Sequence, residues 1–382
     1  MAFTFKKQIF GFMDLLRFKK MTAIRREKLA TAPATPLPAT YTVNEIAAVL
    51  HPGNQKAELI KITSETADTK TYTFRLSKKM FFRAGQYVTV KTAIGQSLVA
   101  RPYAISSSPL TALNKSELSV TVKKAGYFSE WLFDNAKEGD EFVIGDPSGE
   151  FFYEPIKDRP NVVALAGGSG ITPFFSMAQA IAEGTEDFSL TLIYGAKTEK
   201  DIIFKDKIDK LVSDRFKVVY VLSDEKKDGY ESGFITREII QKYAPETYTV
   251  MLCGPQAMYA FADKELEKLG MGGKYVKHEA NCVGRRDVKP AVYKLKVNIK
   301  DQSCEIPAAA EETLLVAMER AGLRVPSKCR AGGCGFCHSK LESGKFSIAG
   351  ADKRRLADAK FGYIHPCCSY PDSDMEITVP EG

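Results

Sequence analysis

The chain has 382 residues, enough for two or three domains. Hydrophobic residues make up 44% and charged residues 26%, an ordinary globular mixture, and the sequence contains no apolar run of about 18 residues that could span a bilayer. The net charge of +7 is concentrated in residues 1–30, where eight Lys and Arg face two acidic residues. The remainder is nearly neutral, which argues against nucleic-acid binding as the main role.

The N-terminal 40 residues differ from the rest. Apolar residues recur at helical spacing among the cations and predict a basic amphipathic helix, followed by a Pro-rich linker at 31–40. The apolar positions are Phe5, Ile9, Phe12, Met13 and Leu16. Such a helix could lie on an anionic membrane surface or dock on another protein, and a disordered solubilising extension is the alternative.

The N-terminus does not read as a secretory signal, because Asp14, Arg17, Lys19 and Lys20 interrupt its apolar run. We therefore expect a cytoplasmic protein, with a peripheral position at the inner membrane face as an option. In a reducing compartment, cysteines are more often metal ligands or bystanders than disulfides.

Short alternating runs follow a brief helical stretch, NEIAAVL. Their spacing and turn residues predict a small antiparallel barrel over about 56–155, within a domain at 41–155. The runs are AELIKIT, KTYTFRL, QYVTVKT, ELSVTVKK and EFVIGDP.

The pattern changes near Asn161. Buried-strand runs alternate with helical segments, which predicts a parallel sheet with helices on both faces, over 156–283. The strand runs are NVVALA, LTLIYG, KVVYVLS and YTVMLCG; the helical runs are PFFSMAQAIAEG, DIIFKDKIDKLV, ITREIIQKYA and PQAMYAFADKELEKLG. A polar joint, VGRRDVKPA, leads to a third domain at 290–382, with a strand (YKLKVNIK) and a helix (EETLLVAMERAG).

The turn AGGSGITP, residues 166–173, lies between a predicted strand and helix. Glycines let backbone amides approach a phosphate, and a helix N-terminus favours an anion there. Thr172 suits the N-cap and Pro173 the first helical position. A tight turn without a ligand has the same composition, so the motif alone leaves both interpretations open.

The barrel contributes RPYAISSSP at 101–109 and VKKAGYFSEWL at 122–132. On one strand, Arg101 and Tyr103 offer a phosphate clamp beside an aromatic face that can stack on a flat ring. An outward arginine beside a half-buried tyrosine is the structural alternative.

The order R-x-Y, G-x-x-S, G-G-x-G-I-T-P and then CGP at 253–255 resembles the ferredoxin–NADP reductase superfamily over about 56–282. The resemblance implies a flavin-binding barrel and a Rossmann-like NAD(P)-binding domain. It implies that Arg101 holds the flavin phosphate, Tyr103 stacks on the isoalloxazine, and the 126–129 turn wraps the pyrophosphate. The residues so placed at cofactors are Arg101, Pro102, Tyr103, Ala104, Ser107, Val122, Lys123, Gly126, Phe128, Ser129, Gly168, Gly170, Thr172, Pro173, Tyr194, Gly195, Cys253, Gly254, Pro255 and Met258.

By the same resemblance, Cys253 and Glu279 join Tyr103 as catalytic residues around the nicotinamide. The sequence departs from the family at Ala104, where a hydroxyl residue often bonds flavin N5, and at Asn281, where an aromatic is usual. Hydride transfer needs no side-chain hydroxyl, but Ala104 puts a proton relay through Cys253 and Glu279 in doubt. A small buried cysteine at a strand end is the alternative for Cys253.

Three cysteines crowd into CRAGGCGFC, and a fourth follows in YIHPCCSYP. The spacing C-x4-C-x2-C with a distant Cys is the plant-type [2Fe–2S] arrangement, with Cys329, Cys334, Cys337 and Cys367 as ligands. Glycines there let amides point at sulfur. A zinc ribbon would need two C-x2-C pairs, and the sequence has one.

Residues 290–382 resemble the ferredoxin domain, which implies a β-grasp fold. The resemblance aligns Cys367 rather than Cys368 as the ligand, leaves Cys282 and Cys304 as packing residues, and gives neither His338 nor His365 the spacing of a Rieske ligand.

A nicotinamide gives up two electrons as hydride, a [2Fe–2S] cluster takes one at a time, and a flavin can do both. The domain order therefore predicts an NAD(P)H-dependent oxidoreductase that passes electrons through a flavin to the cluster and on to a partner redox protein. The architecture resembles reductase components of oxygenases and demethylases and hybrid-cluster-protein reductases.

SEWLFDN favours FAD over FMN, and the mixed charges of YGAKTEKD and LSDEKKDG favour NADH slightly. A non-turning-over redox sensor or electron-transfer subunit, and a zinc-stapled flavin reductase, are the alternatives.

Overall fold

The computed structural model describes residues 12–32, 40–95, 97–271, 273–279, 286–348 and 352–380. They divide into two compact units, Met1–Ile46 and Ala47–Gly382. Among the described residues, no helix combines the length and apolarity needed to cross a membrane.

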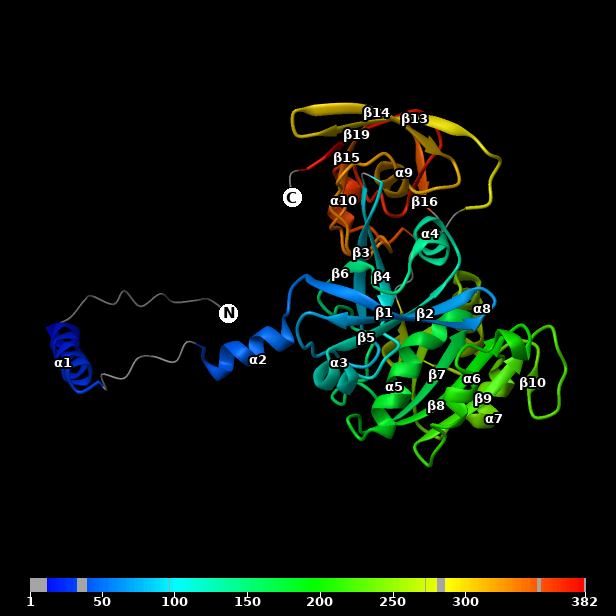
Figure 1. Cartoon of the computed structure of the whole chain (residues 1–382), viewed down its shortest axis with the longest axis horizontal. Coiled ribbons are helices and arrows are strands. Elements are labelled where there is room, and N and C mark those ends of the chain that lie inside the picture. The colour runs from blue at the N-terminus through cyan, green and yellow to red at the C-terminus, as the bar shows by residue number, and fades with distance from the viewer. Residues whose placement is uncertain are drawn as a thin grey trace. The chain divides into compact units, whose positions relative to one another are not determined.

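The N-terminal helix is present as α1 (Phe12–Ala30, dark blue in Figure 1). Its described apolar side chains, Leu16, Phe18, Met21, Ile24 and Leu29, are all exposed. Because each helical residue turns by about 100°, Leu16 and Phe18 point about 200° apart. The expected apolar face of Phe5, Ile9, Phe12, Met13 and Leu16 stays a prediction, because Leu16 is the one member of that set whose side chain is described. Phe5, Ile9 and linker residues 33–39 lie outside the described residues.

The second unit begins in α2 (Thr42–Leu50) and continues into an antiparallel six-stranded sheet of order β4-β3-β6-β1-β2-β5. A bridge between Ile105 and Val120 joins the two end strands and closes the barrel. Alternate side chains such as Tyr72, Phe74 and Leu76 point into its core, as the period of two requires. The elements are β1 (Gln55–Thr66), β2 (Thr69–Leu76), β3 (Tyr87–Ile94), β4 (Ser97–Ala104), α3 (Pro109–Lys115), β5 (Glu117–Lys123), α4 (Tyr127–Asn135) and β6 (Glu141–Ile144).

The next sheet is entirely parallel, in the order β10-β9-β8-β7-β11-β12 (green in Figure 1). One core packs α5 against it through Phe174, and a second packs α7 and α8 through Ile240 and Leu266, so both faces are covered. The elements are β7 (Asn161–Gly167), α5 (Thr172–Ala182), β8 (Ser189–Ala196), α6 (Lys205–Asp209), β9 (Phe216–Leu222), β10 (Glu231–Ser232), α7 (Arg237–Tyr243), β11 (Thr249–Cys253), α8 (Gln256–Lys268) and β12 (Val276–His278), with short 3-10 turns η1 (Gly168–Ile171), η2 (Glu199–Asp201) and η3 (Gly273–Tyr275).

The run DIIFKDKIDKLV is helical over a shorter length than predicted. Phe204 adopts a left-handed conformation (φ 64°) with its ring buried, and only Lys205–Asp209 forms α6. Burial of Ile202, Ile203 and Phe204 in the sheet core therefore overrides the helical pattern of this run.

One helix joins the barrel to the parallel sheet. On α5, the Ser176 hydroxyl donates to the Ser107 carbonyl (2.8 Å) and the Gln179 amide donates to the Ser106 carbonyl (2.8 Å). Just beyond α5, Glu183 accepts a bond of 2.5 Å from the Ser108 hydroxyl. Residues 106–108 are buried, so these bonds fix the barrel directly on α5.

The C-terminal domain has a mixed five-stranded sheet of order β14-β13-β19-β15-β17 (Figure 1). The hairpin β13–β14 is antiparallel, β19 runs parallel to β13, and α9 packs Leu314, Leu315 and Met318 into the core. This arrangement confirms the predicted β-grasp. The elements are β13 (Val292–Ile299), β14 (Gln302–Ala309), α9 (Leu314–Arg320), β15 (Ser339–Ser343), β16 (Phe346–Ile348), α10 (Leu356–Lys360), β17 (Tyr363–Ile364), β18 (Ser369–Pro371) and β19 (Met375–Val379).

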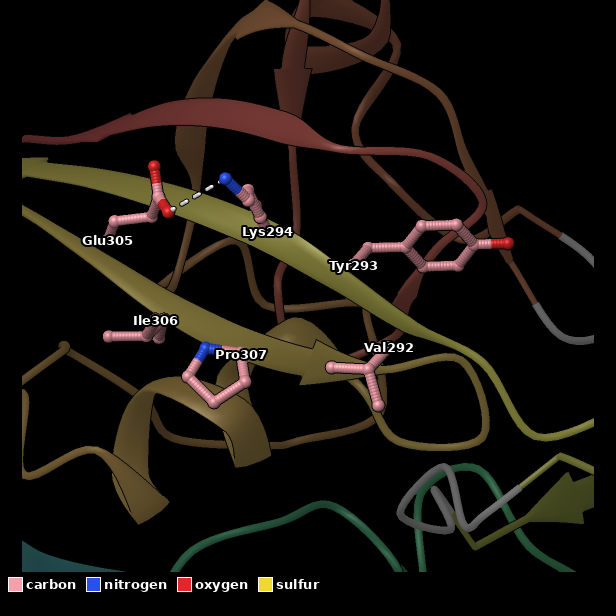
Figure 2. Close-up of a pocket in the computed structure, with 6 residues that line it drawn as sticks. All are labelled: Val292, Tyr293, Lys294, Glu305, Ile306 and Pro307. Carbon is pink, nitrogen blue, oxygen red and sulfur yellow. Dashed lines mark ion pairs between the residues drawn. The ribbon is translucent and has the colours of Figure 1, made fainter.

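A hollow lies on the β13–β14 hairpin, lined by Val292, Tyr293, Lys294, Glu305, Ile306 and Pro307 (Figure 2). Lys294 and Glu305 point toward each other and form a 3.5 Å ion pair at its side. The sheet order places β14 at one edge, whereas the cysteine-bearing loops adjoin β15 and β17 at the other. The hollow is therefore not part of the cysteine site.

Candidate functional site

The R-x-Y strand and the G-x-x-S turn meet at an aromatic row. Tyr103 on β4 stacks with Phe128 of α4 (centroids 6.2 Å apart, planes 25°), and Phe128 stacks with Trp131 (6.4 Å, 14°). The Arg101 guanidinium lies 5.9 Å from the Phe128 centroid. Phe128 is buried, while Tyr103 and Trp131, at the two ends of the row, are half-buried. An aromatic face beside a guanidinium fits a flavin ring and its phosphate.

The 126–129 turn is closed by its own serine. The Ser129 hydroxyl donates to the Gly126 carbonyl (2.9 Å) and accepts from the Ala125 amide (2.9 Å). This hydroxyl therefore shapes the turn. The amides of the first turn of α4 have no partner within the helix and are the groups suited to a pyrophosphate. An added Cβ at Gly126 would meet nothing within 4 Å, so the turn is open.

Three residues predicted to contact the flavin, Ser107, Val122 and Lys123, have side chains that already interact with other parts of the protein. Val122 is buried in the barrel core, and the Ser107 hydroxyl accepts the Ser119 amide (3.1 Å). Lys123 pairs with Asp68 at 3.1 Å. The Val122 side chain points into the barrel core, so a cofactor contact there would involve its backbone, and the contact stays a prediction. Pro102 and Ala104 lie on β4 beside Tyr103 and are half-buried.

The nucleotide turn is tighter than predicted. Residues Gly168–Ile171 form η1, which runs directly into α5, so Thr172 is the first helical residue and Ile171 occupies the N-cap position. The expectation of Thr172 as N-cap is wrong, because the 3-10 turn extends the helical path backward. The Thr172 hydroxyl instead donates to the Ser169 carbonyl (2.7 Å), and Pro173 is buried.

The two glycine motifs are pressed together at the ends of adjacent strands. Cys253 of β11 pairs with Ala166 of β7. A Cβ on Gly170 would lie 2.1 Å from the Cys253 carbonyl oxygen, and a Cβ on Gly254 would lie 2.5 Å from the Met258 sulfur. Only glycine permits this contact. The site lies where strand order reverses around β7, the usual position of a ligand in such sheets.

The Tyr194 side chain contacts the backbone of the glycine turn. Its ring is fully buried, and its hydroxyl donates to the Gly168 carbonyl (2.9 Å) and accepts from the Ile203 amide (3.2 Å). The expected contact of Tyr194 with a cofactor stays a prediction, and its hydroxyl contacts the backbone of the glycine turn directly. Gly195 follows it in β8, paired with Gly167.

Cys253 and Glu279 are neighbours. The Glu279 amide donates to the Leu252 carbonyl (3.0 Å), and its carbonyl accepts from the Tyr259 hydroxyl (3.0 Å). Burial raises the pKa of Glu279 from 4.5 to about 8. Burial, and then the charge of Glu279, raise the pKa of the Cys253 thiol, against a hydrogen bond with Tyr259. At neutral pH this corner holds a neutral carboxyl and a neutral thiol. Asn281 lies outside the described residues.

The four predicted cysteine ligands converge. The Cys329 side chain hydrogen-bonds those of Cys334 and Cys367, and Cys337 hydrogen-bonds Cys367. The hydrogen bond to Cys367 and the other interactions around it hold the pKa of Cys337 at about 7. The amides of residues 331 and 334 point at the Cys329 sulfur (3.4 and 3.5 Å).

These contacts form a series from Cys334 through Cys329 and Cys367 to Cys337, so the four sulfurs lie together, as the ligands of one cluster must.

Cys368 lies behind the loop. Its thiol donates to the His365 carbonyl (3.4 Å) and would be 2.8 Å from a Cβ on Gly332, whose φ of 81° already requires glycine. Cys367 hydrogen-bonds Cys329 and Cys337, whereas the hydrogen bonds of the Cys368 side chain are with Cys367 and the His365 carbonyl.

A buried histidine holds the loop. His365 is fully buried, with Nδ1 at 2.6 Å from the Gly332 carbonyl oxygen and Nε2 at 2.8 Å from Asp358, which Arg355 also binds (2.6 Å). From the sequence, His365 was considered only as a cluster ligand and rejected, and Asp358 was not predicted at all. The tripeptide HPC, in which His365 precedes the ligand Cys367 by two residues, could have indicated that this histidine supports the loop.

The chain matches three protein families in succession: the oxidoreductase FAD-binding domain over residues 56–153, the oxidoreductase NAD-binding domain over 164–264, and the 2Fe-2S iron-sulfur cluster binding domain over 297–372. The chain belongs to the ferredoxin–NADP reductase superfamily and carries a C-terminal [2Fe–2S] ferredoxin domain. The iron–sulfur match favours a cluster over the zinc alternative.

Curated relatives match this reductase along most of its length. It is 28% identical to the glycine betaine monooxygenase reductase subunit of Chromohalobacter salexigens over 85% of this chain and 95% of the relative. It is 29% identical to NADH oxidoreductase HCR of Escherichia coli over 85% and 99%. Phthalate dioxygenase reductase has the same fold (TM-score 0.67, 23% identity, 86% of this chain and 98% of that one).

The protein is therefore an NAD(P)H-dependent oxidoreductase that passes electrons from NAD(P)H through FAD and a [2Fe–2S] cluster to a partner.

Proposed function

We propose that the reductase holds its flavin between Tyr103 and the α4 N-terminus, with Arg101 on the phosphate, and its nicotinamide between Gly170, Cys253 and Glu279. The supporting observation is that residues 106–108, just after Tyr103, are hydrogen-bonded to residues on and just after α5, the helix that follows the glycine turn. The bound flavin supplies the exchange between two-electron and one-electron chemistry. The protein's own contribution is to orient the rings and, through Glu279, to keep an uncharged carboxyl beside the nicotinamide pocket.

We also propose that NADH is the donor. Past the end of β8, Lys227 forms an ion pair with Glu199, to which Tyr230 also donates a 2.5 Å hydrogen bond, and Glu225 accepts the Glu199 amide (2.8 Å). The positive charge of Lys227 is therefore already compensated by the Glu199 carboxylate. A nucleotide 2′-phosphate would add negative charge to this region, whereas the 2′-hydroxyl of NADH would not.

The acceptor is proposed to dock at the cysteine loop with an acidic surface. Residues 324–363 contain nine Lys and Arg against three acidic residues, while the rest of 291–382 contains nine acidic residues against four Lys and Arg. Phe336, Leu356 and Phe361 are 59%, 86% and 61% exposed among those cations. Complementary charge raises association rates, and exposed aromatic and aliphatic side chains supply contact area.

The partner is proposed to be an oxygenase, demethylase or hybrid-cluster type of protein, as the names of the relatives suggest for those relatives. Residues 1–40 are proposed as an additional docking arm. The exposed apolar residues Phe18, Met21 and Ile24 of α1 supply contact area for a partner protein, and an anionic membrane surface is the alternative.

The test begins with the full chain reconstituted with FAD, iron and sulfide. We expect flavin and iron–sulfur absorption bands and NADH-driven reduction of ferricyanide and cytochrome c. Bound cofactors without turnover would instead support an electron-transfer subunit or sensor. Pull-down with and without residues 1–40, and binding to anionic vesicles at low and high salt, then separate a docking arm from a membrane helix.

A further inference from the structure

A carboxylate on the C-terminal domain is shared between two arginines that come from different parts of the second unit. Arg101 Nη1 donates to Glu319 Oε2 (2.8 Å) across 218 positions of sequence. Arg330 binds the same carboxylate with both Nη atoms, at 2.7 and 2.9 Å. All three side chains are nearly buried, at 13%, 5% and 6% exposure for Arg101, Glu319 and Arg330.

Arg101, Glu319 and Arg330 come from three different elements of the fold. Arg101 is on β4, two residues from Tyr103, and Glu319 is in the last turn of α9. Arg330 follows the first cysteine of the loop and takes a left-handed conformation (φ 53°), which a non-glycine residue adopts only when held there. The Glu319 carboxylate therefore connects β4 to the cysteine loop through its side-chain contacts with Arg101 and Arg330.

Arg101, Arg330 and Glu319 together place two positive charges and one negative charge in a nearly buried position. Burial, and then the charge of Arg330, lower the pKa of Arg101, while Glu319 acts in the opposite direction. Excess buried charge is costly unless an anion compensates it. In the described part of the chain, Arg101 uses only Nη1, toward Glu319 and the Ala100 carbonyl, so Nε and Nη2 remain for such an anion.

We propose that Glu319 is a positioning residue that couples flavin binding to docking of the cysteine loop: it holds Arg101 and Arg330 together, and the flavin phosphate completes their charge. This rests on the assignment of Arg101 to the flavin phosphate. Because coupling between two events is reciprocal, flavin binding stabilises the docked loop, and the docked loop favours flavin binding. Electrons then leave the flavin site one at a time for the cluster across a fixed contact.

The experiment compares wild type with Glu319→Gln, which keeps the shape and removes the charge. Glu342→Gln, an exposed change on β15, is the matched control. Hydrogen–deuterium exchange at residues 329–337 is measured in flavin-stripped protein before and after adding FAD. We expect FAD to slow exchange there in wild type and in the control, and to leave it unchanged in E319Q. In the holoprotein, we expect the ratio of cytochrome c to ferricyanide reduction to fall about tenfold in E319Q.

Equal FAD-dependent protection in E319Q and wild type would overturn the proposal, as would an unchanged ratio of the two activities. Iron and sulfide content shows whether E319Q has folded. If it has not, Glu319→Asp, which retains the charge but withdraws it from Arg101 by one methylene, is expected to weaken the protection and the ratio, and no loss in it would equally refute the coupling. Absence of NADH–ferricyanide activity in wild type would instead count against the proposed function.

Discussion

The carboxyl group of Glu279 lies close enough to the Cys253 thiol for its charge to raise the pKa of that thiol. Both groups are uncharged at neutral pH, because burial also raises the pKa of Glu279 to about 8. A neutral carboxyl can donate a hydrogen bond and would add no charge beside the nicotinamide pocket proposed above. The same burial makes Glu279 a measurable source of pH dependence.

Replacing Glu279 with Gln is expected to flatten the pH dependence of stability between pH 5 and 8. The native carboxyl binds its proton up to about pH 8, whereas the unfolded one releases it near 4.5. The folded state therefore holds the extra proton in this window, and the free energy of unfolding falls as the pH rises through it. Melting temperatures at pH 5 and 8 measure the effect, with Glu342→Gln as control. An identical fall in wild type and E279Q would contradict it.

Gly170→Ala is expected to damage nucleotide binding. The added Cβ would lie 2.1 Å from the Cys253 carbonyl oxygen, so the 168–171 turn or the 253–255 turn must move. Overpacking of this kind costs about 1–3 kcal/mol, which predicts a rise of roughly tenfold or more in KM for NADH. Gly273→Ala is the control, since nothing lies within 4 Å of its added Cβ. Steady-state kinetics with ferricyanide provide the measurement, and equal KM values for the two variants would show the assignment to be wrong.

Cys367→Ser and Cys368→Ser are expected to behave differently although the residues are adjacent. The Cys367 side chain contacts those of Cys329 and Cys337, while the Cys368 thiol donates to the His365 carbonyl behind the loop. We expect C367S to lose most of its iron and visible iron–sulfur absorption and C368S to retain them. Iron and sulfide assays decide between them. Retention of the cluster in C367S with loss in C368S would reverse the ligand assignment.

His365→Asn is expected to accelerate loss of the cluster. The imidazole ties the Gly332 carbonyl to Asp358, and both bonds are buried. Leaving such groups unpaired costs about 1–3 kcal/mol, so the half-life of the visible absorption in chelator is expected to shorten by roughly tenfold or more. His278→Gln is the control, since that histidine pairs with Asp263 near the surface. Half-lives that agree within error would argue against a holding role.

Local patterns in the sequence predicted the barrel and the parallel sheet, while the β-grasp fold of the third domain came from its resemblance to the ferredoxin domain. Alternation predicted the barrel strands, continuous apolar runs predicted the parallel sheet, and the cysteine spacing predicted the loop. Each of these signals lies within about ten neighbouring residues, where periodicity and turn chemistry operate. The boundaries were less accurate: the 3-10 turn before Thr172 and the left-handed Phe204 depend on packing against the sheet.

The side-chain contacts around the cofactor motifs could not be predicted in the same way. Glu319 lies in the ordinary helix sequence EETLLVAMER, and nothing near it indicates a partner 218 positions away. Tyr194 lies near the end of the buried strand β8, so its sequence context did not distinguish contact with a nucleotide from hydrogen bonding to the glycine turn. Pairings between distant positions are set by the assembled fold, and a local pattern carries no record of them.

The attachment of residues 106–108 to α5 has a consequence for how such proteins diversify. These bonds join the barrel to the parallel sheet without any residue of the C-terminal domain, whose own contact with the barrel includes the Glu319–Arg101 pair. Recombination that replaces the C-terminal domain could therefore give such a protein a new electron acceptor, provided that the incoming domain also supplies a partner for Arg101.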